Sequence, residues 1–193
     1  TLARQIDLGA PADILITAGL YPMEFLQSKG TIADNSVTQI TTNSLVAVVP
    51  TDRNILATDI KSLFQTTARP VIADPKLSPA GLYAKQTLQH LGLWNSLEKR
   101  LVLASDVRNA IAYVESGAAD LGLVYYTDAI NSRKVRQVFA VNPQYHDPIV
   151  YPGALMKDTV PKDPGKQFLK YLLSSESKAR LSSLGFGISL SVD

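Results

Sequence analysis

Short apolar runs alternate with segments of helical periodicity along most of this 193-residue chain. Each run has the length and composition of a buried strand, and the predicted strands are 12–17, 45–49, 71–73, 102–104, 121–125, 135–141 and 151–156. The segments between and around them predict helices at 1–6, 21–30, 59–64, 79–91, 107–116 and, as two stretches, 163–184. Strands that alternate with helices predict an α/β fold with mostly parallel sheets. The continuous run 45–49 indicates a strand that is covered on both faces.

Composition narrows the class of protein further. Hydrophobic residues make up 46% of the chain, which is enough for one large domain or two small lobes with a proper core. The 19 basic and 17 acidic residues are mixed along the chain and leave a formal charge of +2, so no basic face for nucleic acid or anionic lipid is evident. Cysteine is absent, which excludes disulfides and thiolate chemistry. No apolar run approaches the length of a membrane span.

Two predicted helices begin in a way that suits an anion. They open with Ser78-Pro79-Ala80-Gly81 and with Ser105-Asp106-Val107. The first backbone N–H groups of a helix have no partner within the helix, and the helix dipole leaves partial positive charge there, so an oxyanion can bind at this end. Ser78 and Ser105 are equally well explained as ordinary N-cap residues, with Pro79 in the first turn.

The position of these helix starts favours a shared site. Ser78 and Ser105 follow predicted strands, and Tyr125 ends a third. In α/β sheets, ligands bind at the carboxyl ends of strands, so the three segments are expected to lie along one rim. A tyrosine at the end of an apolar strand can also serve only in packing, and both interpretations stay open at this point.

The residue types for catalysis or metal binding are not grouped in the sequence. His90 and His146 are far apart and have no spacing partner for a metal site. Four aspartates, which are Asp13, Asp74, Asp120 and Asp128, lie beside strand ends, where caps and turns commonly use this residue. Because no nucleophile stands beside a base, we expect a protein that is not an enzyme.

Several strings in this order resemble the periplasmic molybdate-binding proteins of ABC transporters. They are TLARQIDLGAPADILITA (1–18), NSLVAVVP (43–50), ADPKLSPAGLYAKQTLQHLGLW (73–94), SDVRNAIAYVESGAADLGLVYYTDA (105–129) and YPGALM (151–156). Each string alone is a weak signal, whereas the ordered set, which runs over nearly the whole chain, is specific.

The resemblance implies a two-lobed periplasmic-binding-protein fold of class II that closes over a tetrahedral oxyanion. Lobe I would comprise 1–44 plus 153–193, and lobe II would comprise 45–152. The family's first strand, helix and second strand are expected ahead of Thr1, so lobe I would be truncated at its N-terminal side and incomplete. That missing segment would also carry two serines of the family's site.

Carried over by position, the resemblance implies that the oxyanion is held by the backbone N–H groups of Ala80 and Val107 and by the Tyr125 hydroxyl, with no direct metal-ion ligand. It also implies molybdate and tungstate as ligands, a membrane permease as partner, a periplasmic location and no cofactor. A receptor for sulfate or another oxyanion or organic anion is an alternative with the same fold. The ligand-sensing domain of a transcription regulator is a second alternative.

Overall fold

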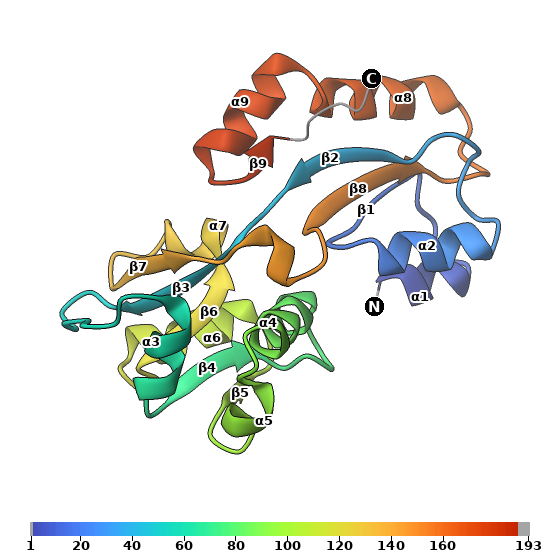
Figure 1. Ribbon diagram of the computed structural model, residues 1–193. Coiled ribbons are helices and arrows are strands. Elements are labelled where there is room, and N and C mark those ends of the chain that lie inside the picture. Colours follow the sequence, from blue (N-terminus) through green and yellow to red (C-terminus); the bar gives the residue numbers. More distant parts are fainter. Residues whose placement is uncertain (1, 189–193) are drawn as a thin grey trace. The chain divides into compact units, whose positions relative to one another are not determined.

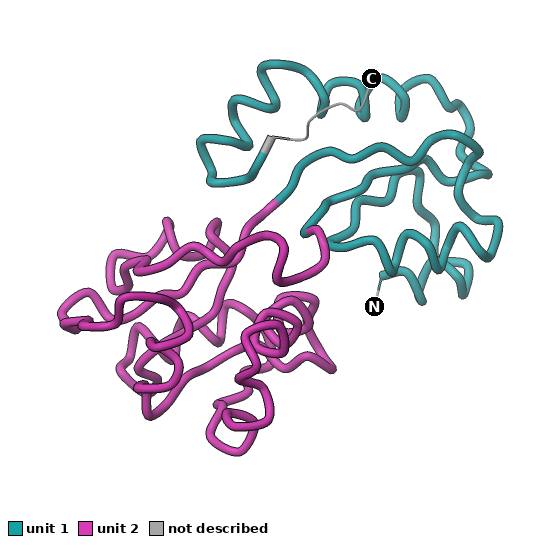
Figure 2. The backbone as a smooth tube through the Cα atoms, in the orientation of Figure 1, with its two compact units in different colours: residues 1–42, 149–193 teal, residues 43–148 magenta. Residues whose placement is uncertain are grey.

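The computed structural model describes residues 2–188, which fold as two compact units (Figures 1 and 2). Unit 1 comprises residues 1–42 and 149–193, and unit 2 comprises residues 43–148. The chain therefore passes from unit 1 to unit 2 after Thr42 and returns after Pro148.

Unit 1 is built on a sheet with the strand order β1-β8-β2-β9, in which every neighbouring pair is antiparallel. Its strands are β1 (Ile14–Ile16), β2 (Thr38–Thr42), β8 (Val150–Leu155) and β9 (Gly187–Ile188). Its helices are α1 (Leu2–Asp7), α2 (Tyr21–Ser28), α8 (Lys162–Leu172) and α9 (Ser175–Ser183).

Helices cover both faces of the unit 1 sheet (Figure 1). Leu15 and Ala154 belong to a core cluster with residues of α1 and α2. Their strand neighbours Ile14 and Leu155 belong to a second cluster with Leu169 of α8. Successive side chains of a strand point to opposite faces, so this alternation divides the core into two layers.

Unit 2 contains a sheet with the strand order β5-β4-β6-β3-β7. The strands are β3 (Leu45–Pro50), β4 (Pro70–Ala73), β5 (Val102–Ala104), β6 (Leu121–Tyr125) and β7 (Val135–Ala140). The helices are α3 (Ile60–Thr66), α4 (Pro79–His90), α5 (Trp94–Leu97), α6 (Val107–Glu115) and α7 (Tyr126–Ala129), and a 3-10 turn follows at Pro143–Tyr145.

The three central strands of unit 2, which are β4, β6 and β3, are buried on both faces. Val46, Val71 and Val124 belong to a core cluster with Ala110 and Val114 of α6. The strand neighbours of these valines, among them Ala47, Ile72 and Leu123, are at most 1% exposed, so the opposite face is covered as well. The prediction from the continuous run at 45–49 is therefore confirmed.

The mixed α/β class is confirmed, but the expectation of mostly parallel sheets is wrong. Among the described strand pairs, only β4 with β5 and β4 with β6 are parallel. β3 runs antiparallel to both β6 and β7. An apolar run shows that a strand is buried but not in which direction it runs, which depends on how the chain returns to the sheet.

The sequence missed four short elements, namely β2, α5, α7 and β9. Their lengths lie between two and five residues, which is too short for a periodicity to be recognised. β2 has the sequence TQITT, and polar residues hide its alternation. Its pairing with β8, which residues more than 100 positions later supply, makes it a strand.

Candidate functional site

Three parallel strands end at one edge of the unit 2 sheet. β4 is hydrogen-bonded to β5 on one side and to β6 on the other, with Ala73 opposite Ala104 and Ile72 opposite Leu123. α4 begins shortly after β4, α6 begins shortly after β5, and Tyr125 ends β6. The structure therefore brings the three predicted segments to one rim, which we call the carboxyl rim.

A tight turn places the start of α4 against the end of β4. The Asp74 carbonyl accepts hydrogen bonds from the N–H groups of Leu77 and Ser78, and an Asp74 carboxylate oxygen accepts one from Lys76 N–H. A Cβ atom added to Gly81 would lie 2.2 Å from the carbonyl oxygen of Ala73. Only glycine allows the first turn of α4 to approach the strand this closely.

The first turn of α4 presents backbone donors. Ser78 occupies the N-cap position, but its side chain makes no capping hydrogen bond. Pro79 has no N–H, and no acceptor for the N–H groups of Ala80 and Gly81 is found among the described residues. The next N–H, of Leu82, already bonds to the Ser78 carbonyl at 3.2 Å.

Asp106, not Ser105, is the N-cap residue of α6, which corrects the sequence expectation. An Asp106 carboxylate oxygen accepts a hydrogen bond from Asn109 N–H at 2.8 Å. The Ser105 hydroxyl instead accepts from the Asn109 side-chain amide at 2.6 Å. Aspartate is as good a cap as serine, so the residue nearer to the helix takes the role. No acceptor for Val107 N–H is found within the described chain.

Tyr125 lies where β6 passes into α7. It is 8% exposed, and its backbone is extended, at the N-cap position of α7. The next residue, Tyr126, begins α7, and its N–H still bonds to the Ser44 carbonyl at 2.9 Å, one position beyond the Leu45–Tyr125 pair. The Tyr126 side chain packs on the core cluster beneath α6.

Two carboxylates flank the start of α6. Hydrogen bonds, of which the one from Asn109 N–H is the strongest cause, lower the pKa of Asp106, so this group is charged at neutral pH. Burial raises the pKa of Asp128, and the charge of Asp106 adds to this shift, while Arg108 opposes it. The side chains around the α6 N-terminus therefore carry charges of both signs. The backbone N–H groups there are uncharged hydrogen-bond donors.

Sequence reasoning missed two contributors to the carboxyl rim. Gly81 is needed for the close packing of α4 on β4, and it adds a second N–H beside that of Ala80. The sequence signal for this role was a glycine in the first turn of a helix that follows a strand. Asn109 holds both Ser105 and Asp106, and the signal was an amide three residues after an aspartate at a helix start.

The histidines pack against aromatic rings. His90 stacks on Tyr145 with ring centroids 4.3 Å apart, and His146 lies 5.8 Å from Tyr83. Within residues 2–188, no group of three or more histidine, cysteine or acidic side chains could hold a metal ion. In the same residues, no helix combines the length and apolarity needed to cross a membrane.

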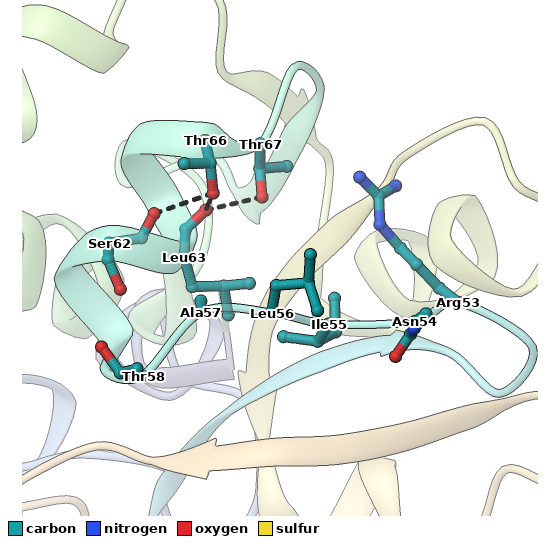
Figure 3. A pocket seen from close by; sticks show the side chains of 10 residues that line it. All are labelled: Arg53, Asn54, Ile55, Leu56, Ala57, Thr58, Ser62, Leu63, Thr66 and Thr67. Atoms are coloured by element: carbon teal, nitrogen blue, oxygen red, sulfur yellow. Dashed lines mark hydrogen bonds between the residues drawn. The ribbon is translucent and has the colours of Figure 1, made fainter.

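The opposite edge of the unit 2 sheet carries an ion-pair cluster and a hollow. Asp120, just before β6, pairs with Arg53 at 2.7 Å and with Arg69, just before β4, at 3.1 Å. A hollow of about 420 Å³ lies beside α3 and is lined by residues 53–58, Ser62, Leu63, Thr66 and Thr67 (Figure 3). Because Thr67 precedes β4 rather than following it, this hollow is not part of the carboxyl rim.

Comparison with known proteins finds one matching family and several similar relatives. Residues 1–187 match the family described as bacterial extracellular solute-binding protein. The chain is 36% identical over 190 residues to the molybdate-binding protein ModA of Haemophilus influenzae, covering 96% of this chain and 74% of that protein. It is 36% identical over 197 residues to ModA of Escherichia coli, covering 97% and 75%.

A solved structure is also similar. The periplasmic molybdate-binding protein of Azotobacter vinelandii superposes with a TM-score of 0.81 at 26% identity, over 98% of this chain and 84% of that one.

Proposed function

Because the chain belongs to the family of bacterial extracellular solute-binding proteins, we propose that it captures molybdate for an ABC importer. The observation that carries the proposal is the carboxyl rim, where two helix N-termini and a tyrosine meet at the ends of adjacent strands. Support for the ligand comes from two relatives that are named molybdate-binding proteins, of which the chain covers 74% and 75%.

The proposed ligand contacts are the N–H groups of Ala80 and Val107 and the hydroxyl of Tyr125. Molybdate is a divalent anion that carries no proton near neutral pH, so a suitable site offers donors and no acceptors. Each hydrogen bond to a charged group contributes roughly 1.5 to 3 kcal/mol. The two helix dipoles add favourable potential without a lysine or arginine in contact with the anion.

The proposed donor set predicts a preference among anions. Tungstate has the charge and shape of molybdate, and we propose that it binds as well. Phosphate is usually protonated once at neutral pH, and a site made only of donors would leave that proton without an acceptor, which costs affinity. Sulfate lacks such a proton, so it is the competitor that tests the selectivity for size.

The proposed role is binding and release, without catalysis, in the periplasm. Units 1 and 2 would be the two lobes of the receptor, and a permease of an ABC transporter would accept the anion. At the start of α6 the Ser105 hydroxyl donates to an Asp106 carboxylate oxygen at 3.3 Å, and both residues accept hydrogen bonds from Asn109, so these side chains form the cap of the helix.

Calorimetric titration of molybdate into the full-length protein, with sulfate as competitor, tests the proposal. We expect molybdate to bind at least about tenfold more tightly than sulfate, which corresponds to 1.4 kcal/mol. Tyr125→Phe should weaken molybdate binding by about 1 to 2 kcal/mol, or roughly 5- to 30-fold in Kd, because one charge-assisted hydrogen bond is lost.

Tyr126→Phe is the matched control and should leave the affinity unchanged, because that ring packs on the core. An unchanged Kd in Tyr125→Phe would remove this residue from the site. Sulfate binding as tightly as molybdate would overturn the choice of ligand.

A further inference from the structure

A second hollow, in unit 1, is separate from the carboxyl rim. Its volume is about 570 Å³, and its walls are residues 33–36 and Thr38, the end of β8 with the segment after it, and one side of α8. Apolar side chains line it at Ala33, Leu155, Leu169 and Leu173. Three of these four are at most 8% exposed, so they form a floor that belongs to the core. We call this feature the lysine hollow, for the residues described next.

Four lysines surround this apolar floor. Lys162, Lys166 and Lys170 follow one another at intervals of four along α8, which places them on one side of the helix, and Lys157 lines the hollow from the segment after β8. All four are exposed. Asp34 is the one acidic lining residue, so the lining carries a formal charge of +3, against +2 for the whole chain.

These lysines form no salt bridge with an acidic side chain of the described residues. The ion pairs found among residues 2–188 join Asp120 to Arg53 and Arg69, in the other unit, and none includes a lysine of this hollow. Four ammonium groups around one concavity raise the positive potential there, which attracts an anion. The charge therefore points to an anionic occupant.

Hydrogen bonds hold the opposite wall in place. The Ser36 hydroxyl accepts from Leu155 N–H at 3.2 Å and donates to the Ala33 carbonyl at 2.7 Å, while Ala33 N–H bonds to the Leu155 carbonyl at 2.9 Å. Asn35 between them has a φ of +56°, a conformation that asparagine tolerates and that closes the turn. Because this wall is fixed to β8, the lysine hollow exists without an induced rearrangement.

We propose that the lysine hollow binds an organic anion with an apolar body, such as an alkyl phosphate or a fatty carboxylate. The body would lie on Leu155, Leu169 and Leu173, and the acidic group would meet the ammonium groups at the rim. Lysine suits this arrangement because its stem covers apolar surface while its charge stays in water. The volume falls within the usual range for small organic ligands. The anion is either free in solution or the head of a membrane lipid.

The test uses octyl phosphate, below its micelle concentration, titrated calorimetrically into the full-length protein in saturating molybdate. Molybdate occupies the proposed oxyanion site, so the titration reports on the lysine hollow alone. We expect octyl phosphate to bind at least about tenfold more tightly than inorganic phosphate or octanol, because each of these lacks half of the complementary chemistry.

The double variant Lys166→Gln/Lys170→Gln removes two charges and should weaken octyl phosphate binding roughly fivefold or more. Lys61→Gln/Lys99→Gln is the matched control, since it removes two exposed lysines of unit 2 that do not line the hollow. Both variants should keep the molybdate affinity of the parent, which also shows that they fold.

A vesicle arm separates the two sources of the anion. Co-sedimentation with vesicles that contain phosphatidylglycerol, alongside octyl phosphate binding, would identify a lipid head; octyl phosphate binding without vesicle binding would identify a free ligand. Either result supports the proposal. Equal affinity for octanol, vesicle binding without octyl phosphate binding, or no effect of the lysine double variant would overturn it.

Discussion

Replacing Gly81 by alanine tests whether the first turn of α4 is part of the oxyanion site. The new Cβ would lie 2.2 Å from Ala73 O, 2.6 Å from Asp74 C and 2.7 Å from Ala73 C. All three are backbone atoms, so no side-chain rotation can relieve the clash. The first turn must retreat by about 0.8 Å to reach 3.0 Å, below which Cβ contacts essentially never occur.

This displacement has two measurable effects. Overpacking of this kind typically costs about 1 to 3 kcal/mol of stability. The retreat also moves Ala80 N–H away from the position it holds at the rim, and losing about one charge-assisted hydrogen bond corresponds to a loss of affinity of roughly tenfold or more. Urea unfolding and calorimetric titration of molybdate measure the two effects separately.

Gly92→Ala, just beyond the other end of α4, is the matched control. Gly92 has a φ of +71°, and an added Cβ there would meet nothing within 4 Å. Its cost is backbone strain alone, about 1 to 2 kcal/mol of stability, with the molybdate affinity unchanged. If folded Gly81→Ala protein bound molybdate as tightly as the parent, the assignment of Ala80 N–H to the site would be refuted.

Three further substitutions probe the helix starts and the ion-pair cluster. Asp106→Asn keeps an oxygen to accept from Asn109 N–H but removes a negative charge beside α6, so molybdate affinity should rise about two- to fivefold in calorimetry; a decrease would contradict an anion at this helix start. Ser78→Ala should change the unfolding free energy by less than the ~1 kcal/mol of an ordinary cap, because the Ser78 side chain makes no capping bond; a full loss in urea unfolding would argue against this geometry. Burial alone would raise the pKa of Asp120, but hydrogen bonds and charge from Arg69 and Arg53 outweigh it and lower the pKa. The stabilisation by this carboxylate is therefore present above its ordinary value of 3.8 and is lost as the pH falls through the lowered one. Asp120→Asn should lower the thermal midpoint at pH 7 by roughly 2–4 °C, the shift that about 1 kcal/mol produces in a chain of this size. The difference in midpoint between variant and parent should close as the pH falls below 3.8. A difference that stays constant with pH would exclude the ion pairs as its cause.

Local patterns predicted much of unit 2. The strand at 121–125 has the bounds that the sequence predicted, and Gly117 follows the end of α6 with a φ of +72°. Such elements are readable because apolar spacing and glycine at a helix end act over one or two turns. The carboxyl rim could also be anticipated, since in a run of strand, helix and strand the helix starts follow the strand ends.

Other features depended on residues distant in the sequence. β2 is a strand because β8 pairs with it. The direction of β3 is defined only by its neighbours β6 and β7, to both of which it runs antiparallel. The cap of α6 shifted from Ser105 to Asp106 because the exact first turn is set by backbone geometry, to which the sequence pattern is accurate only within a residue or two.

The lysine hollow also depends on residues that are distant in the sequence. By composition the chain has mixed charges and no evident basic face, yet Lys157 and three lysines of α8 come together with the segment that begins at Ala33 in the folded unit.

By itself, the sequence determined the α/β class, most helices and strands, the family resemblance and the candidates Ala80, Val107 and Tyr125. Tertiary structure alone decided strand direction, the close approach at Gly81 and the assembly of the hollow. These depend on contacts between segments far apart in the chain, whereas periodicity and capping act between neighbours.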